Sequence, residues 1–510
     1  MKRQMLFIEP TAAQVNIFSK FTLPRLGSFI LAGLVNRRSP WSARVFIEGR
    51  QRFDLDAWIA HNGLPDVVGI STITATAKRG FAIADECRSR GIPVILGGPH
   101  VTFLADEALG HAELVVRGEG ETAMNALLDL WSEGYVPATD AQYASVPNLS
   151  WKDAAGVVRH NDLAPWIADL DALPVSDFSL ARGTADCTVG GKKIVVVQTS
   201  RGCPFDCSFC SVTGMFGKKL RHRSVEATLR ELRQYNTRSH FIFFCDDNFT
   251  ANRRHARELL EAMVAEEFRF QWSTQVRADL ARDPELVRLM KRAGCHTVFI
   301  GFESVNPTSL KEMKKGQNLD DIRNAIRVVQ GAGIHIHGMF VFGFDGDEWG
   351  TVEATVQFIR QMKLTSVQLL LLTPLPGSEL YRQLVADERI LSFDWDLYDT
   401  HHVVYRPARF TPFELQCAQV YGHTRLYALP EGLKKLVTGR WVSAGLSFYA
   451  WKINRDWQKG NQAYLRTLAD ASRPSAGGLD NGCCAAGALG RIDAARRPAP
   501  GILPARPRAR

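Results

Sequence analysis

The chain has 510 residues, of which 45% are hydrophobic and 23% are charged. This balance excludes disordered, collagen-like and coiled-coil classes and leaves enough apolar material for two to four domains. The formal net charge of +9 favours an acidic partner or an anionic membrane surface. No run reaches the roughly 18 uncharged apolar residues of a spanning segment, so the sequence predicts no transmembrane helix.

Cysteine usage and the first residues bear on the compartment. The ten cysteines form no disulfide framework, which agrees with a reducing environment. The apolar run within residues 1–10 is too short for a signal peptide. We therefore predict a cytoplasmic protein, and peripheral contact with the inner face of the membrane stays open as an alternative.

Residues 1–135 alternate apolar strands with helices, a pattern typical of a parallel sheet covered on both faces. Strands are predicted at 4–9, 43–48, 66–70, 93–96 and 114–117, and helices at 27–36, 78–90 and 122–133. Glycines follow several of these strands, and doubly wound sheets bind ligands at that edge. The fold class is therefore α/β, and it starts with a Rossmann-like domain.

A second βα series is predicted from 193 to 384, after a connector at 136–192 that holds a hairpin around 153–156. Its strands are expected at 194–199, 241–245, 271–276, 297–301, 335–342 and 367–372, and its helices at 224–235, 253–266, 284–293, 319–332 and 351–362. Six strands are too few for a closed eight-stranded barrel. We therefore predict a six-unit partial (βα)6 barrel.

The remaining residues form two compositional blocks. Residues 385–470 carry many aromatic side chains and a basic, apolar stretch at 433–457. They are predicted to form a small, mostly helical region that shapes a pocket, either as a lid on the barrel mouth or as a face on a membrane. Residues 471–510 are rich in Ala, Pro, Gly and Arg and are predicted to be disordered.

Three cysteines stand out by their spacing: Cys203, Cys207 and Cys210 follow a C-x3-C-x2-C pattern directly after a predicted strand. This position is the C-terminal mouth of a βα barrel, where active sites gather. A 4Fe-4S cluster normally takes four Cys ligands, so three leave one iron open for a cofactor or substrate. A structural zinc site is the alternative, but zinc favours a fourth ligand at short spacing.

With Phe209 before the last cysteine, this motif resembles the signature of the radical S-adenosylmethionine (SAM) superfamily. Similar strand ends at 243–249, 298–304, 337–343 and 372–378 extend the resemblance over roughly residues 192–384. The resemblance implies that the open iron chelates SAM and that the reduced cluster cleaves it to a 5'-deoxyadenosyl radical. It also implies an external electron donor of flavodoxin or ferredoxin type.

The resemblance suggests which side chains contact SAM. Glu303, Ser304 and Asp246 follow strands, and the two carboxylates suit the ribose hydroxyls. Glu303 as a surface carboxylate and Asp246 as the cap of the helix near Asn252 remain alternatives. Arg201 and Arg277 have the fork geometry to pair with the SAM carboxylate, and a surface ion pair is an equal reading for Arg277.

The N-terminal domain resembles the cobalamin-binding domain that precedes the radical SAM domain in one large subgroup. The matching segments are 68–74, 95–100 and 116–121, and they supply the predicted cofactor-binding residues Ser71, Thr74, Gly97, Gly98, Gly118 and Glu119. Paired glycines let the backbone approach a flat macrocycle. The D-x-H-x-x-G motif, whose His ligates cobalt, is absent here and usually absent from the subgroup. A Rossmann-like sheet without a cofactor stays open as an alternative.

These resemblances imply a cobalamin-dependent radical SAM enzyme that functionalises an unactivated carbon, with methyl transfer to a lipid, tetrapyrrole or secondary metabolite as the leading reaction. Cyclisation or oxidation of tetrapyrroles or lipids is the alternative. A methylthiotransferase would need a second three-Cys cluster, and the N-terminal domain has only Cys87. A role on RNA would need a basic module with aromatic residues, so no nucleic-acid partner is expected.

Overall fold

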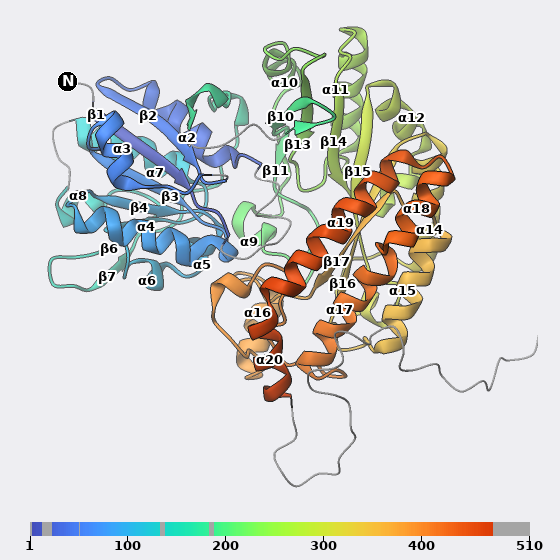
Figure 1. Cartoon of the computed structure of the whole chain (residues 1–510). Helices are drawn as coiled ribbons and strands as arrows, with labels where there is room; N and C mark the ends of the chain where they lie inside the picture. Colours follow the sequence, from blue (N-terminus) through green and yellow to red (C-terminus); the bar gives the residue numbers. More distant parts are fainter. Residues whose placement is uncertain (1–2, 13–22, 50, 133–137, 183–187, 473–510) are drawn as a thin grey trace, which may run out of the picture.

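The computed structural model describes residues 3–12, 23–49, 51–132, 138–182 and 188–472. Two sheets dominate the chain, and Figure 1 shows the N-terminal sheet beside a second, curled sheet whose outer side is covered by helices. Orange and red helices of the C-terminal region run across the far edge of that second sheet (Figure 1). The predicted tail, with Cys483 and Cys484, lies almost entirely outside the described residues.

The N-terminal sheet has eight strands in the order β7-β6-β5-β4-β3-β1-β2-β8. Its parallel strands are β1 (Arg3–Glu9), β2 (Trp41–Ile47), β3 (Val67–Ser71), β4 (Val94–Gly97), β5 (Leu114–Val116) and β8 (Ala181–Arg182). The hairpin of β6 (Leu149–Lys152) and β7 (Val158–His160) pairs antiparallel with β5. Residues of the predicted connector thus extend this sheet on both sides.

Helices cover both faces of this sheet, as the alternating pattern predicts. One face carries α2 (Leu26–Asn36) and α7 (Gly120–Ser132), which pack on each other and on the sheet. The other face carries α3 (Leu55–Asn62), α4 (Ala77–Ser89), α5 (Pro99–Phe103) and α6 (Ala105–Ala108). The short helix α8 (Asp140–Tyr143) precedes the hairpin. Two apolar cores, one per face, hold this domain together.

The second sheet is the predicted partial barrel, with strand order β17-β16-β15-β14-β13-β10-β9. Its six parallel strands are β10 (Lys192–Val197), β13 (His240–Phe244), β14 (Gln271–Val276), β15 (Cys295–Glu303), β16 (His335–Phe342) and β17 (Ser366–Leu371), and β9 (Thr188–Val189) adds an antiparallel edge. Its helices are α9 (Val212–Phe216), α10 (Val225–Leu232), α11 (Arg253–Ala265), α12 (Pro284–Arg292), α13 (Pro307–Glu312), α14 (Leu319–Gly331), α15 (Trp349–Gln361) and α16 (Glu379–Ala386).

The C-terminal region is helical, as predicted. It contains α17 (Pro412–Leu426), α18 (Leu429–Val437), α19 (Trp441–Gly460) and α20 (Gln462–Ala471). Helix α17 contacts α15, α19, α20 and β17, so these helices lie against the β17 edge of the curled sheet. No helix in the described ranges is long and apolar enough to cross a bilayer.

Side chains of α17 complete the free edge of β17. The Tyr427 hydroxyl, just after the helix, accepts from the N–H of Val367 at 2.7 Å and donates to its carbonyl. The carbonyl of Leu369 accepts from Gln419 at 3.1 Å and from His423 at 3.0 Å. An unpaired strand edge is a template for aggregation, and these contacts explain why the open barrel ends at β17.

Candidate active site

The three cysteines lie on the loop that leaves β10, at the carboxyl end of the curled sheet. A two-stranded ribbon, β11 (Ser200–Arg201) with β12 (Arg221–His222), frames this loop. Gly202 has φ +89° and an added Cβ would lie 2.5 Å from the carbonyl of Lys219, so only glycine fits there. All three cysteine side chains are half-buried and free, which places the loop at a solvent-accessible rim.

The cysteines form a soft donor set held beside one cation. Burial raises the pKa of Cys203, and it raises the pKa of Cys210 to about 12. These two thiols therefore keep their protons at neutral pH unless a bound metal displaces them. The guanidinium of Arg277 donates to the Cys207 sulfur at 3.8 Å. Across the described residues no three His, Cys, Asp or Glu side chains are gathered as ligands of a metal ion. The cluster assignment therefore depends on the donor set and its spacing, not on ligand geometry.

Asp246 accepts hydrogen bonds from the residues that precede the cysteine loop. Its carboxylate accepts from the N–H of Thr199 at 3.2 Å, from the Thr199 hydroxyl at 2.8 Å and from the Ser200 hydroxyl. Burial raises the pKa of Asp246, although these bonds oppose the rise. The helix-cap alternative is wrong, because Asn252 caps α11 by accepting from the N–H of His255. Asp246 thus orders the strand end that leads to Cys203.

Glu303 lies at the end of β15 with φ +63°, a left-handed conformation that is uncommon for a non-glycine residue and concentrates at functional sites. It is a buried carboxylate, not a surface one, and it pairs with Lys315, which also donates to the carbonyl of Gly301 at 2.7 Å. Ser304 is buried beside it, and its hydroxyl accepts from the N–H of Asn306 at 3.0 Å. The sequence reasoning missed Lys315.

Arg277 contacts both the cysteine loop and Lys315. Its guanidinium carbon lies 3.6 Å from the ring centroid of Phe205 in the cysteine loop, and its Nη2 donates to the carbonyl of Lys315. The residue is only 9% exposed, and its Nε lies 3.8 Å from a carboxylate oxygen of the partly exposed Asp279, so the ion pair of the alternative does form while the guanidinium itself is buried. The end of β14 therefore presents a buried cation between the cysteines and the Glu303–Lys315 pair.

The carboxyl edge of the N-terminal sheet gathers the other predicted residues. Ser71, Gly97 and Gly118 follow or end the neighbouring strands β3, β4 and β5, and Thr74 begins the next turn. Gly98 has φ +100°, and an added Cβ would lie 2.5 Å from the carbonyl of Thr72. At Gly118 an added Cβ meets nothing within 4 Å, so the space beside this residue is open.

Glu119 faces the other domain. Its carboxylate accepts from Arg221 at 2.8 and 2.9 Å and from Arg201 at 3.1 Å, and Arg201 also donates to Glu121 at 2.7 Å. We call these four residues the interdomain ion-pair cluster; none of their side chains is more than 7% exposed. Burial opposes the charge of Arg201, but Glu121 and Glu119 together raise its pKa. We expected cofactor contacts at Glu119 and SAM contacts at Arg201, and the structure shows ion pairs for both side chains.

The same two parts meet again through Phe103. Its ring lies where Cβ atoms of Gly214 and Gly377 would be, at 3.1 Å and 2.4 Å respectively. Gly214 belongs to α9, which follows the cysteine loop, and Gly377 belongs to the loop after β17. The carboxyl edges of the two sheets therefore face each other across the cysteine loop.

Alternate residues of the curled sheet are half-buried and point to its inner side. In β16 and β17 these are His335, His337, Met339, Ser366, Gln368 and Leu370, while their neighbours pack under the outer helices. Phe299 continues this inner side, 5.0 Å from the ring of His337. The inner side therefore combines aromatic rings and apolar side chains with hydrogen-bonding groups.

The residues present fit the implied cofactors by chemistry. Three half-buried thiols at C-x3-C-x2-C spacing suit a cluster that has one open iron. A glycine-lined rim at the carboxyl edge of a parallel sheet suits a flat cofactor. Both sets lie at the junction of the two domains.

Comparisons with known proteins agree with this arrangement. The model of the radical SAM superfamily matches residues 197–359, and the model of the B12 binding domain matches residues 19–128. An uncharacterised methyltransferase of Pyrococcus horikoshii is 30% identical over 84% of this chain and 94% of that protein. The bacteriochlorophyllide d C-12(1)-methyltransferase of Chlorobaculum tepidum is 32% identical over 68% of this chain and 71% of that protein.

A solved structure shows the same fold. The cobalamin-dependent SAM radical enzyme OxsB, solved with aqua-cobalamin and SAM, superposes with a TM-score of 0.67 at 16% identity, over 92% of this chain and 75% of that one. The fold and the cysteine loop thus define an enzyme of the radical SAM superfamily. Within it, the chain belongs to the subgroup that carries a B12 binding domain.

Proposed function

We propose that this enzyme methylates an unactivated carbon of a small molecule, with SAM and cobalamin as cofactors. The observation that carries the proposal is the junction itself, where the three-cysteine loop faces the glycine-lined rim of the B12 binding domain. Bound there, a 4Fe-4S cluster with an open iron would supply the electron that cleaves SAM, and cobalamin would carry the methyl group. The methyltransferases among the relatives support this reaction.

We assign roles to residues of the barrel mouth. Cys203, Cys207 and Cys210 hold the cluster, and Asp246 orders the segment that precedes them. Arg277 places a cation beside Cys207, where the SAM carboxylate needs a partner. Lys315 adds a second cation next to Glu303. Glu303 and Ser304 are the acceptors for the ribose. When SAM binds, Glu303 exchanges part of its pairing with Lys315 for hydrogen bonds from the ribose hydroxyls.

The rim of the N-terminal sheet is assigned to cobalamin. Ser71 and Thr74 offer hydroxyls, and Gly97, Gly98 and Gly118 allow close approach of the main chain. Glu119 contributes indirectly, because its carboxylate is engaged with Arg201 and Arg221. Its role is to fix the rim against the cysteine loop.

The inner side of the curled sheet indicates the class of substrate. Phe243, Phe299 and His337 form a continuous aromatic series, with Phe243 and Phe299 ring centroids 5.9 Å apart. Such a surface suits a bulky, mainly apolar molecule, and we propose a lipid or a tetrapyrrole. An external donor of flavodoxin or ferredoxin type would supply electrons in the reducing cytoplasm. We also propose peripheral contact with the inner face of the membrane, which the exposed apolar side chains of α18 and α19 support.

The test uses full-length protein reconstituted with iron and sulfide without oxygen. The enzyme with SAM, cobalamin and a reductant should release 5'-deoxyadenosine, and Cys203→Ala should abolish the release. Cys295→Ala is the matched control, because Cys295 is buried at the start of β15, at the opposite end of the sheet, and it should retain the release. Equal activity of the two variants would exclude the ligand assignment.

The reaction is identified from its product. Lipid and pigment extracts of a deletion strain, incubated with the enzyme, should contain one compound that gains a single CH2 by mass spectrometry, with S-adenosylhomocysteine formed in parallel. A compound that loses hydrogen without gaining carbon would instead establish cyclisation or oxidation. A product formed without added cobalamin, by protein free of it, would exclude the role of the N-terminal domain.

A further inference from the structure

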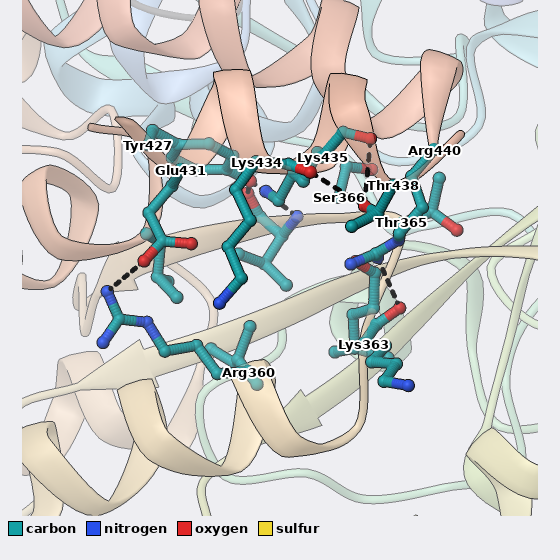
Figure 2. Close-up of a pocket in the computed structure, with 14 residues that line it drawn as sticks. Arg360, Lys363, Thr365, Ser366, Tyr427, Glu431, Lys434, Lys435, Thr438 and Arg440 are labelled. Carbon is teal, nitrogen blue, oxygen red and sulfur yellow. Dashed lines mark hydrogen bonds and ion pairs between the residues drawn. The ribbon is translucent and has the colours of Figure 1, made fainter. Parts of the chain in front are cut away.

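A basic pocket lies at the end of the curled sheet where the strands begin, opposite the cysteine loop. It has a volume of about 540 Å³ and lies between the end of α15, the start of β17, and α18 with the turn that follows it. Five basic side chains and one carboxylate line it: Arg360, Lys363, Lys434, Lys435, Arg440 and Glu431 (Figure 2). Positive charge in this excess attracts an anion.

Part of this charge has a structural role. Arg360 donates to the carbonyl of Arg425 at 2.7 Å and pairs with Glu431 at 3.1 Å. Arg440 donates to the carbonyls of Lys363 and Leu364 at 2.9 Å and 3.2 Å. These bonds satisfy main-chain groups at segment ends, and they account for both arginines.

The lysines are not accounted for in this way. Within the described ranges, the ammonium groups of Lys363 and Lys434 have no hydrogen-bond or carboxylate partner. Figure 2 shows the Lys434 side chain extending into the space between Arg360 and Lys363. Lys435 donates to the Ser447 hydroxyl at 2.8 Å; burial lowers its pKa, and Arg440 lowers it further. The pocket thus holds more cationic charge than the protein neutralises.

An exposed apolar face adjoins this pocket. Residues of α18 and α19 with large exposed apolar side chains are Leu429, Leu433, Leu436, Val437, Trp441, Val442, Leu446 and Tyr449. The α18 members recur at helical spacing and therefore share one face. Val437 is 87% exposed and Trp441 is 69% exposed, and both flank the turn that carries Arg440. Apolar side chains beside basic ones are typical of a surface that lies in a bilayer interface.

We propose that this pocket binds the phosphate group of an anionic membrane lipid while the α18–α19 turn enters the bilayer interface. The phosphate oxygens accept from Lys363 and Lys434, and the acyl chains meet Val437 and Trp441. The inference deepens the proposed membrane contact, but it is independent of catalysis because the pocket lies at the opposite end of the sheet. In this orientation the cysteine loop and the B12 binding domain face away from the membrane.

The test is co-sedimentation of the full-length protein with vesicles. One set contains phosphatidylcholine alone, and the other contains equal parts of phosphatidylcholine and phosphatidylglycerol. Binding should favour the anionic vesicles and weaken with added salt. Lys434→Glu should weaken that binding about fivefold or more, since each basic residue near an anionic surface contributes about this factor. Arg269→Glu, an exposed basic position outside the pocket, is the matched control and should have no comparable effect.

A second pair of variants examines the apolar part. Val437→Ser should weaken binding to both kinds of vesicle, whereas Val264→Ser, at an exposed apolar position on α11, should not. Circular dichroism of each variant confirms that it is folded. Equal losses of vesicle binding in Lys434→Glu and Arg269→Glu would exclude the phosphate site in the pocket and indicate binding through diffuse surface charge.

Three further outcomes would also overturn the proposal. Binding to both vesicle types without preference would leave membrane contact but no phosphate site. Calorimetric binding of inorganic phosphate by protein that ignores vesicles would assign the pocket to a free anion. A doubled mass in light scattering that Val437→Ser restores to the monomer value would assign the apolar face to a second copy of the chain.

Discussion

The interdomain ion-pair cluster allows a quantitative prediction. Glu119→Gln keeps the shape of the side chain but turns one carboxylate oxygen into an NH2 group, which cannot accept a hydrogen bond. At present the two oxygens accept from Arg221, from Arg201 and from the N–H of Ile167 at 2.8 Å. After the change a buried donor loses its acceptor, and Arg221 loses its charged partner, keeping the one remaining amide oxygen and the carbonyls of Ile167 and Phe216.

The expected cost follows from burial. Removing one partner of a buried ion pair costs about 3–5 kcal/mol, because the remaining charge stays buried without compensation. Glu121→Gln should cost less, since Arg201 then still pairs with Glu119 at 3.1 Å. Asp56→Asn is the control: Asp56 pairs with Arg90 on the exposed surface of the same domain, and solvent screens such pairs, so no measurable change is expected.

The assay is urea unfolding of the three variants without oxygen, followed by iron analysis of each folded sample. Glu119→Gln should lower the free energy of unfolding most and should also retain less iron, because Arg201 lies two residues before Cys203. Equal unfolding curves for Glu119→Gln and Asp56→Asn would refute the reasoning. A destabilised variant with full iron content would limit the cluster's role to stability.

Three other changes test single features. Burial lowers the pKa of His423 to about 4, so the folded state favours the neutral form of this side chain. Up to about 3 kcal/mol of stability should therefore be lost as pH falls from 6.5 towards 4. In urea titrations His423→Gln should flatten this pH dependence, whereas His61→Gln, on the surface, should not. Asp246→Asn should cost about 1–3 kcal/mol in thermal unfolding by leaving a buried donor unpaired, with loss of iron; unchanged iron would contradict its role under the cysteine loop. Gly98→Ala should destabilise by about 1–3 kcal/mol because of its backbone conformation, whereas Gly27→Ala, in the exposed start of α2 with nothing within 4 Å of an added Cβ, should be neutral or slightly stabilising; the same sign for both would refute the strain.

Most strands and long helices were predictable from local sequence patterns. Each of the six predicted barrel strands overlaps a strand of the structure, because apolar runs bounded by glycine and polar turns report buried parallel strands directly. Helices α3 and α16 and the short helices α5, α6, α8, α9 and α13 were not predicted. Their mixed or very short sequences give little helical periodicity, and their caps, such as Asp54 for α3, are the stronger signal.

The candidate site was predictable only where its residues are close in sequence. The cysteine motif and the strand-end glycines are local, and both reach the junction of the two sheets. Lys315 was missed because the pair with Glu303 depends on the path of α13, and Glu119 lies 82 positions before Arg201. Such pairs are products of domain packing, and single-sequence spacing carries no trace of them. The cap at Asn252 was within reach of local reasoning, since its side chain accepts from the N–H three residues on.

The completion of the β17 edge by Tyr427, Gln419 and His423 has a consequence for how this enzyme can be divided. A chain shortened to the radical SAM region would expose bare carbonyl and amide groups along the last strand, and copies could then stack edge to edge into fibrils. The helices after residue 411 therefore protect the open edge of the half-barrel from pairing with another chain. Efforts to grow crystals of, or graft, the catalytic part alone should keep α17 attached.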